Sequence, residues 1–169
     1  QNKILKHLKN NAYKSIIISD YMHGLFDKDF IDKILKIVRQ KKTTIYVDQQ
    51  SSHKKSGFNI YNNIYYLIIN KNELNLFNKQ NITIKQKIKN ISKQLNIPNI
   101  VIKLGSNGSI AYLDNKFFKT EVFKKINNLS NTSGAGDYFL AKFVASYNKN
   151  FKVRLKLSNK FSYDYIIKN

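Results

Sequence analysis

The chain has 169 residues, of which 42% are hydrophobic and 13% aromatic, and its formal net charge is +20. This is the length of one ordinary domain, and the hydrophobic content argues against an intrinsically disordered chain. The absence of cysteine excludes disulfides and thiolate metal sites, and three scattered histidines argue against a zinc site. Because the apolar runs are too short to cross a bilayer and no signal-peptide core opens the sequence, we expect a soluble, cytoplasmic protein.

The positive charge raises the alternative of a basic nucleic-acid-binding protein. The lysines, however, are spread through every segment beside many asparagines and isoleucines, which is typical of a biased composition rather than of one basic face. An anionic small substrate suits the charge equally well. We therefore expect any affinity for DNA to be weak, independent of sequence and strongly reduced by salt.

The first half of the chain alternates strand and helix patterns. Ser15–Asp20, Thr43–Asp48 and Ile64–Ile69 are short apolar runs typical of buried parallel strands. Asp27 is placed to cap a helix after the first of them, because apolar residues then recur at helical spacing. Those residues are Ile31, Ile34, Leu35 and Val38. The polar connection from Gln49 to Asn63 is longer than a typical loop, which favours a functional role.

The second half continues with a helix predicted over Thr83–Leu95 and a strand over Asn99–Leu104. The residues Gly105–Gly108 are typical of a turn. Beyond this turn, an antiparallel pair of strands is predicted over Ser109–Leu113 and Lys116–Phe123. Helical spacing then returns in two final segments, Ala135–Tyr147 and Leu155–Ile167.

This alternation predicts an α/β fold with a mostly parallel sheet covered by helices on both faces. In such sheets ligands bind beyond the carboxyl ends of the strands. The residues that fall at those ends are Asp20, Asp48, Asn70, Lys103 and Gly105. We therefore expect the functional site at this edge of the sheet.

The stretch Gly134–Asp137 concentrates small residues directly before a predicted helix. Small residues let the backbone approach a ligand, and the first turn of the helix offers N–H groups and the positive end of its dipole. Such a turn could bind an anion while Asp137 takes a proton from a hydroxyl during phosphoryl transfer. The simpler alternative is a strand-to-helix turn in which the dipole favours an aspartate.

The sequence NTSGAGDYF, residues 131–139, resembles the C-terminal signature D-T-x-G-A-G-D-x-F of the PfkB, or ribokinase-like, carbohydrate kinases. Further motifs precede it in the family's order. Ser19–Gly24 is similar to the SDY-x-[KH]-G segment of the heptose-7-phosphate kinase branch, and Val47–Gln50 lies where that branch has D-P-K. Asn70–Glu73 matches N-x-x-E, and Lys103–Gly108 matches the nucleotide-side [TK]-x-G-x-x-G loop.

The resemblance implies a three-layer α/β/α fold and transfer of the γ-phosphoryl group of ATP, with Mg²⁺, to a hydroxyl of a sugar or sugar phosphate. It implies that Asp137 is the general base. The anion hole would be formed by the amides of Gly134, Ala135 and Gly136. The nucleotide would be lined by Lys103, Gly105, Ser106 and Gly108. Asn70 and Glu73 would act through magnesium and its waters. Candidates on the substrate side are Asp20, His23 and Asp48.

Taken singly, several motifs have simpler explanations. Asn70 and Glu73 have the spacing of a capping arrangement at a helix start, and Gly105 and Gly108 that of a hairpin turn. Asp20, His23 and Asp48 could merely end strands or lie in a solvated loop. Two departures leave the substrate open, namely Asn131 in place of the leading aspartate and Gln49-Gln50 in place of proline-lysine.

Members of the family also carry an N-terminal half with a Gly-rich sugar-binding segment and a small β lid, and neither is found in this sequence. We therefore expect residues 1–169 to correspond to the C-terminal catalytic and nucleotide-binding portion of a PfkB-type kinase domain. The alternative is a truncated, non-catalytic protein that keeps the fold and nucleotide binding. As partners, the resemblance allows a homodimer and a fused or separate nucleotidyltransferase domain.

Overall fold

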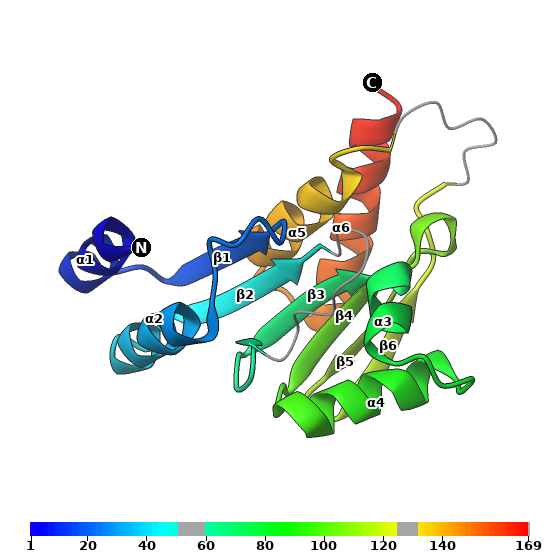
Figure 1. Cartoon of the computed structure of the whole chain (residues 1–169). Helices are drawn as coiled ribbons and strands as arrows, with labels where there is room; N and C mark the ends of the chain where they lie inside the picture. The colour runs from blue at the N-terminus through cyan, green and yellow to red at the C-terminus, as the bar shows by residue number, and fades with distance from the viewer. Residues whose placement is uncertain (51–59, 125–131, 169) are drawn as a thin grey trace.

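The computed structural model describes residues 1–50, 60–124 and 132–168 (Figure 1). Within these residues the strands form a six-stranded sheet in the order β1-β2-β3-β4-β5-β6. Strands β1 to β4 are parallel, whereas β5 is antiparallel to both β4 and β6. The strands are β1 (Ser15–Asp20), β2 (Thr44–Gln49), β3 (Tyr66–Asn70), β4 (Asn99–Lys103), β5 (Ser109–Leu113) and β6 (Lys116–Thr120).

Helices cover both faces of this sheet (Figure 1). One face carries α2 (Lys28–Gln40), α3 (Lys71–Phe77) and α4 (Ile84–Leu95). The other carries α5 (Ala135–Ala145) and α6 (Phe151–Ile166), while α1 (Asn2–Asn10) packs against α2. The predicted three-layer α/β/α architecture with a mostly parallel sheet is confirmed.

The sheet divides the hydrophobic core into two clusters. Successive side chains of a strand point to opposite faces, so Leu67 and Ile69 of β3 pack toward α2 and α4, whereas Tyr66 and Ile68 pack toward α5 and α6. Continuing this alternation by one step places the last residue of β3, Asn70, on the α5 face. By the same count two residues near the ends of the neighbouring strands also face α5. These residues are Asp48 of β2 and Lys103 of β4.

The helix starts agree with the capping signals in the sequence. The Asp27 side chain accepts a hydrogen bond from the Phe30 N–H at 2.8 Å, and Thr83 forms a capping box with Gln86. Helix α6 begins four residues before the predicted Leu155, because the Asn150 side chain accepts from the Val153 N–H and stabilises an earlier first turn.

Other boundaries differ from the predicted ones. Helices α1 and α3 are additional to the predicted elements, β6 ends at Thr120 rather than at Phe123, and the turn after β4 contains a 3₁₀ helix over Gly105–Asn107. Most of the connection from Gln49 to Asn63 lies outside the described residues, as does Asn131. Among the helices that are described, none combines the length and the apolar character that crossing a membrane requires.

Candidate active site

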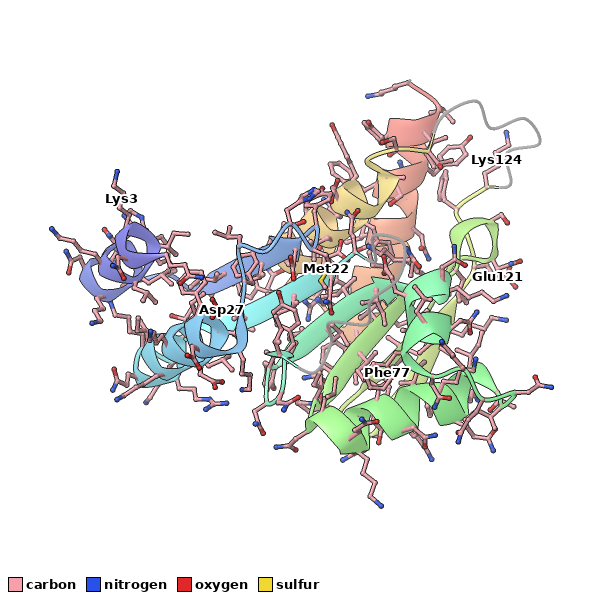
Figure 2. All side chains as sticks on the ribbon, in the orientation of Figure 1. Lys3, Met22, Asp27, Phe77, Glu121 and Lys124 are labelled. Atoms are coloured by element: carbon pink, nitrogen blue, oxygen red, sulfur yellow. The ribbon has the colours of Figure 1, made fainter. Side chains whose placement is uncertain are left out.

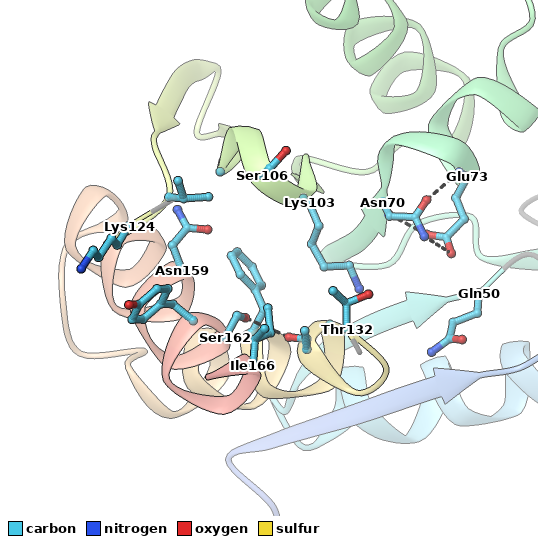
Figure 3. Close-up of a pocket in the computed structure, with 17 residues that line it drawn as sticks. Gln50, Asn70, Glu73, Lys103, Ser106, Lys124, Thr132, Asn159, Ser162 and Ile166 are labelled. Atoms are coloured by element: carbon cyan, nitrogen blue, oxygen red, sulfur yellow. Dashed lines mark hydrogen bonds between the residues drawn. The ribbon is translucent and has the colours of Figure 1, made fainter. Parts of the chain in front are cut away.

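A cavity of about 390 Å³ opens at the carboxyl ends of β3 and β4, facing the start of α5 (Figure 3). One end of the cavity lies against α6 and the segment after β6, and its polar lining there consists of Asn159, Ser162, Tyr163 and Lys124. The other end lies at the strand ends and is lined by Gln50, Asn70, Glu73 and Lys103. The predicted edge of the sheet therefore does carry a cavity.

The first turn of α5 forms one wall of this cavity through Ala135 and Gly136. Gly134, the residue before the helix, has φ = 83°, which lies in the left-handed region that favours glycine. Gly136 has ordinary helical backbone, but a Cβ atom there would lie 3.1 Å from the Lys103 Nζ. The first glycine is therefore favoured by its conformation, whereas a Cβ at the second would press against the end of the Lys103 side chain.

The amides of this turn are not all available to a ligand. The Ala135 N–H donates to the Thr132 carbonyl at 3.2 Å. For the amides of Gly134 and Gly136, by contrast, no hydrogen bond to another of the described residues is found. Among the described residues, therefore, no acceptor competes with an anion's oxygen for these two N–H groups of the predicted three-amide anion hole.

Asp137 lies half-buried in the same turn, on the side that faces the segment after β1. Its Oδ2 atom is 3.4 Å from the hydroxyl of Tyr21, which donates to it. Tyr21 was not among the candidates from sequence, although it belongs to the SDY segment that the resemblance singled out. The structure thus brings that segment to the predicted base.

Lys103 and Asp48 form an ion pair at the strand ends. The Lys103 Nζ lies 3.0 Å from Oδ1 and 2.9 Å from Oδ2 of Asp48. The Asp48 side chain is fully buried, whereas the Lys103 side chain is 15% exposed to solvent. Burial raises the pKa of the Asp48 carboxyl, the Lys103 ammonium opposes this rise, and the nearby Asp137 charge adds to it. Asp48, Lys103 and Asp137 therefore belong to one electrostatic cluster.

Asn70 and Glu73 form a capping box at the start of α3, visible in Figure 3. The Asn70 Oδ1 accepts from the Glu73 N–H at 2.9 Å, and the Glu73 carboxylate accepts from the Asn70 N–H at 2.6 Å and from its Nδ2 at 2.8 Å. The structural role suggested by this spacing is therefore present, and both residues also line the cavity.

Gly105, Ser106 and Gly108 line the cavity above β4. Gly108 closes this loop, since its carbonyl accepts from the Leu104 N–H at 2.8 Å. The structure thus places all of the predicted nucleotide-loop residues at the cavity.

None of the three substrate-side candidates lines the cavity, although Asp48 is paired with Lys103, which does. The other two, Asp20 and His23, lie elsewhere. The buried Asp20 carboxylate accepts from the Met22 N–H at 2.8 Å and from the Tyr61 hydroxyl at 2.6 Å. Burial, and after it the contact with Asp20, raises the pKa of Tyr61. His23 is exposed in the loop that follows. Neither side chain lines the cavity.

Sequence reasoning also missed Asn159, which is nearly buried on α6. Its Nδ2 donates to the Thr120 Oγ1 at 2.8 Å and to the Glu121 carbonyl at 3.0 Å. This arrangement depends on how α6 packs on β6, so no local sequence signal could have identified it.

Within the described residues, no group of three or more His, Cys, Asp or Glu side chains is placed to hold a metal ion. The oxygens that the cavity does offer at its strand end, those of Asn70 and Glu73, suit an Mg²⁺ ion that is carried mainly by phosphates and waters.

Comparison with known families adds an independent observation. Residues 3–158 match the model described as the pfkB family carbohydrate kinase. The chain belongs to this family. Its relatives include the bifunctional protein HldE of Aliarcobacter butzleri strain RM4018, which is 24% identical over 162 residues, covering 92% of this chain and 33% of the relative.

Solved structures show the same ribokinase-like fold. The Arabidopsis thaliana ribokinase complexed with ribose and ATP superposes with a TM-score of 0.73 at 18% identity, covering 96% of this chain and 52% of that one. Phosphofructokinase-2 from Escherichia coli, in complex with fructose-6-phosphate, gives a TM-score of 0.78 at 12% identity, covering 99% and 56%. The chain therefore spans about half the length of these structures and a third of the length of the curated relative.

Proposed function

We propose that this protein is a carbohydrate kinase that transfers the γ-phosphoryl group of ATP to a hydroxyl of a sugar or sugar phosphate. The observation that carries the proposal is the first turn of α5, whose Ala135 and Gly136 line one cavity together with Gly105 and Gly108 of the nucleotide loop, in a chain of the pfkB family. Asp137 follows Gly136 directly in this turn and does not itself line the cavity. A phosphoryl donor in this cavity would thus lie next to the turn that carries the proposed base.

The shape of the cavity suggests how ATP lies in it. We infer that the adenine base occupies the end against α6, where Tyr163 and Ile166 provide apolar surface. The phosphates then extend toward Lys103 and the first turn of α5. The N–H groups of Gly134 and Gly136 and the dipole of α5 would stabilise the charge on the transferring group.

Asp137 is proposed as the general base that takes the proton of the acceptor hydroxyl. Its carboxylate faces Tyr21, so the acceptor would enter from the side of β1. Asn70 and Glu73 would hold Mg²⁺ through its waters, and the ion, when bound, neutralises charge on the phosphates. Transfer then depends on positioning rather than on covalent chemistry by the protein.

For the acceptor we propose only the chemical class, a sugar or sugar phosphate. Relatives are known in complex with ribose and with fructose-6-phosphate, and the net charge of +20 favours an anionic acceptor by attraction over distance. Residues 1–169 are proposed as one PfkB-type domain portion. The homodimer and the nucleotidyltransferase domain stay predictions.

Asp137→Asn tests the proposed base. We expect the rate of ATP- and magnesium-dependent phosphorylation to fall by about 100- to 10,000-fold, because the proton acceptor is lost while the shape of the site is kept. The measurement is sugar phosphate formed from a panel of sugars and sugar phosphates, together with ATP affinity by calorimetry, which should not change. Asp114→Asn is the matched control, since Asp114 lies in the β5–β6 hairpin at positive φ, where asparagine is equally suited.

Other outcomes separate the alternatives. Unchanged turnover in Asp137→Asn would refute its role as the base. A chain that binds ATP but phosphorylates no acceptor would support the non-catalytic alternative. Tight, sequence-selective binding of DNA at physiological salt would instead support a nucleic-acid-binding function.

A further inference from the structure

The loop that follows β1 brings Tyr21 to the proposed base. The Tyr21 hydroxyl donates to the Asp137 Oδ2 at 3.4 Å, although the two residues lie 116 positions apart in the chain. For the Asp137 carboxylate, no hydrogen bond to any other of the described residues is found. Tyr21 is therefore the described side chain that can fix the orientation of this carboxylate.

The contact leaves room for an acceptor molecule. It is long for an O–H···O hydrogen bond, as catalytic hydrogen bonds often are before substrate binds. The Tyr21 side chain is 44% exposed and Asp137 is half-buried, so an acceptor that enters from the side of β1 can reach both groups. Because Tyr21 donates to Oδ2, the other oxygen, Oδ1, keeps its capacity to accept a proton.

A buried network holds the loop that carries Tyr21. Asp20, the last residue of β1, is 4% exposed, and its Oδ1 accepts from the Met22 N–H at 2.8 Å. Its Oδ2 accepts from the hydroxyl of Tyr61, which is fully buried. Both oxygens of this carboxylate are thus used to fix the chain on either side of Tyr21.

The backbone of Met22 favours a functional reason for this arrangement. Met22 has φ = 60°, in the left-handed region that residues other than glycine and asparagine seldom adopt. Strained backbone of this kind persists where its surroundings hold it, and it clusters at active sites. The Asp20 carboxylate holds it here through the Met22 N–H. A turn maintained at this energetic cost suits a loop whose tyrosine has to face the base.

We propose that Tyr21 is a positioning residue for the acceptor step, whose hydroxyl holds the Asp137 carboxylate so that Oδ1 takes the proton of the acceptor hydroxyl. Asp20 holds Tyr21 in turn, a role that needs no contact with substrate. The proposal rests on the kinase function proposed above and adds the group that orients its base. In the transfer the acceptor O–H bond breaks, its proton goes to Asp137, and its oxygen bonds to the γ-phosphorus as ADP leaves. Tyr21 keeps its own proton.

Tyr21→Phe removes the hydroxyl and keeps the ring. We expect kcat for phosphorylation of the acceptor to fall by about 10- to 100-fold, the usual effect of losing one hydrogen bond to a charged group. KM for ATP should not change, because Tyr21 does not line the cavity. Tyr112→Phe is the matched control and should keep the native kcat, since its hydroxyl donates to the Asn115 side chain in the β5–β6 hairpin at 2.9 Å.

A double-mutant cycle separates positioning from a general effect on the structure. Asp137→Asn removes the base, so a residue that acts only through Asp137 then has no carboxylate to orient. We therefore expect Asp137→Asn with Tyr21→Phe to phosphorylate the acceptor as fast as Asp137→Asn alone. Losses that multiply would show that Tyr21 acts independently of Asp137, and the proposal would be wrong.

Variants of Asp20 test how the loop is held. Asp20→Asn keeps an oxygen that can accept from the Met22 N–H and should keep most of kcat. Asp20→Ala loses this oxygen, so its kcat should fall as far as in Tyr21→Phe, with no further fall when the two changes are combined. Equal losses in Asp20→Asn and Asp20→Ala would contradict the role of the Met22 contact. If thermal unfolding shows that Asp20→Ala does not fold, the Tyr21 variants, which leave the buried network intact, decide the proposal.

Carbon NMR of a chain that is isotope-labelled at its aspartate carboxyls measures the contact without turnover. The Asp137 signal, assigned by its loss in Asp137→Asn, should shift in Tyr21→Phe and keep its position in Tyr112→Phe. An unshifted Asp137 signal, or a native kcat in Tyr21→Phe, would overturn the proposal while the kinase function stands. A native chain that phosphorylates no acceptor would instead overturn the kinase function, and the role given to Tyr21 with it.

Discussion

The two glycines of the nucleotide loop have different conformations and different surroundings. Gly105 has φ = 57°, and a Cβ atom added there would meet no other atom within 4 Å, so other residues can adopt this left-handed conformation at modest cost. Gly108 combines φ = 80° with ψ = −129°, a region that is almost restricted to glycine, and its Cβ would lie 2.1 Å from the Thr120 carbonyl oxygen. Gly108 therefore fixes both the loop and its contact with β6.

We predict that Gly108→Ala lowers the free energy of unfolding by about 3 kcal/mol, because backbone strain and a clash with a main-chain atom act together. Gly105→Ala should cost only about 1 kcal/mol. Urea unfolding of the two variants measures the difference. Equal losses would show that the loop shifts freely away from Thr120.

At the scale of elements, α3 depends on its capping box. This helix has only seven residues, too few to be stable by itself, and its buried Leu74 and Glu73 attach it to the sheet. The cap satisfies N–H groups that the first turn leaves without partners. Because the same residues line the cavity, the start of α3 has both a structural and a proposed phosphate-side role.

We predict that Asn70→Ala lowers the free energy of unfolding by about 1 kcal/mol through loss of the cap. Asn70→Ser should recover most of this loss, because a serine hydroxyl also caps a helix. Chemical unfolding gives the two stabilities, and ATP affinity in the presence of magnesium shows whether serine also replaces the amide at the phosphates. Similar destabilisation by alanine and serine would contradict the capping explanation.

At the scale of the whole molecule, Arg154 connects the α5–α6 layer to the sheet. This α6 side chain is 2% exposed and donates from Nε and Nη2 to the Phe143 carbonyl of α5 at 3.1 and 3.0 Å. It also donates to the hydroxyls of Tyr46 in β2 and Tyr66 in β3, each at 3.3 Å. Its guanidinium lies 3.9 Å from the centre of the Phe143 ring, a favourable cation–π contact.

We predict that Arg154→Met lowers the free energy of unfolding by about 3 kcal/mol, since it leaves a buried carbonyl and two buried hydroxyls without their donor. Arg39→Met is the control. Arg39 is exposed and donates to the Asn63 carbonyl at the surface. Arg39→Met should therefore lower the free energy of unfolding by about 0.5 kcal/mol or less. Denaturant unfolding measures the stability of both variants. A loss of stability in Arg154→Met no larger than in Arg39→Met would contradict the view that Arg154 connects the α5–α6 layer to the sheet.

The charge of the molecule is likewise a property of its whole surface. Figure 2 shows nitrogen-tipped side chains projecting from α1, α2 and α4, which lie far from the start of α5. This distribution agrees with the biased composition predicted from sequence. Long-range attraction of anions is its physical consequence, whereas a specific site needs the local arrangement at the strand ends.

The sequence by itself determined the order of the elements, the buried parallel strands and the edge of the sheet that carries the cavity. These follow from local signals, namely apolar periodicity, helix caps and glycines, each of which acts over a few residues. The motif around Asp137 also identified the first turn of α5 as the candidate anion site. Within the described residues, the short helices α1 and α3, the 3₁₀ helix after β4 and several boundaries escaped these signals.

The tertiary structure alone decided which strand-end residues work together. Lys103 and Asp48 are 55 positions apart, and Tyr61 and Asp20 are 41 apart. Asp48 and Asp20 each lie near the end of a strand with the same local pattern. The Asp48 carboxylate contacts an ammonium group at the cavity, whereas the Asp20 carboxylate accepts from a tyrosine hydroxyl away from it. The reason is that strand order and the alternation of faces choose the partner of each side chain, and neither is encoded in the residues next to it.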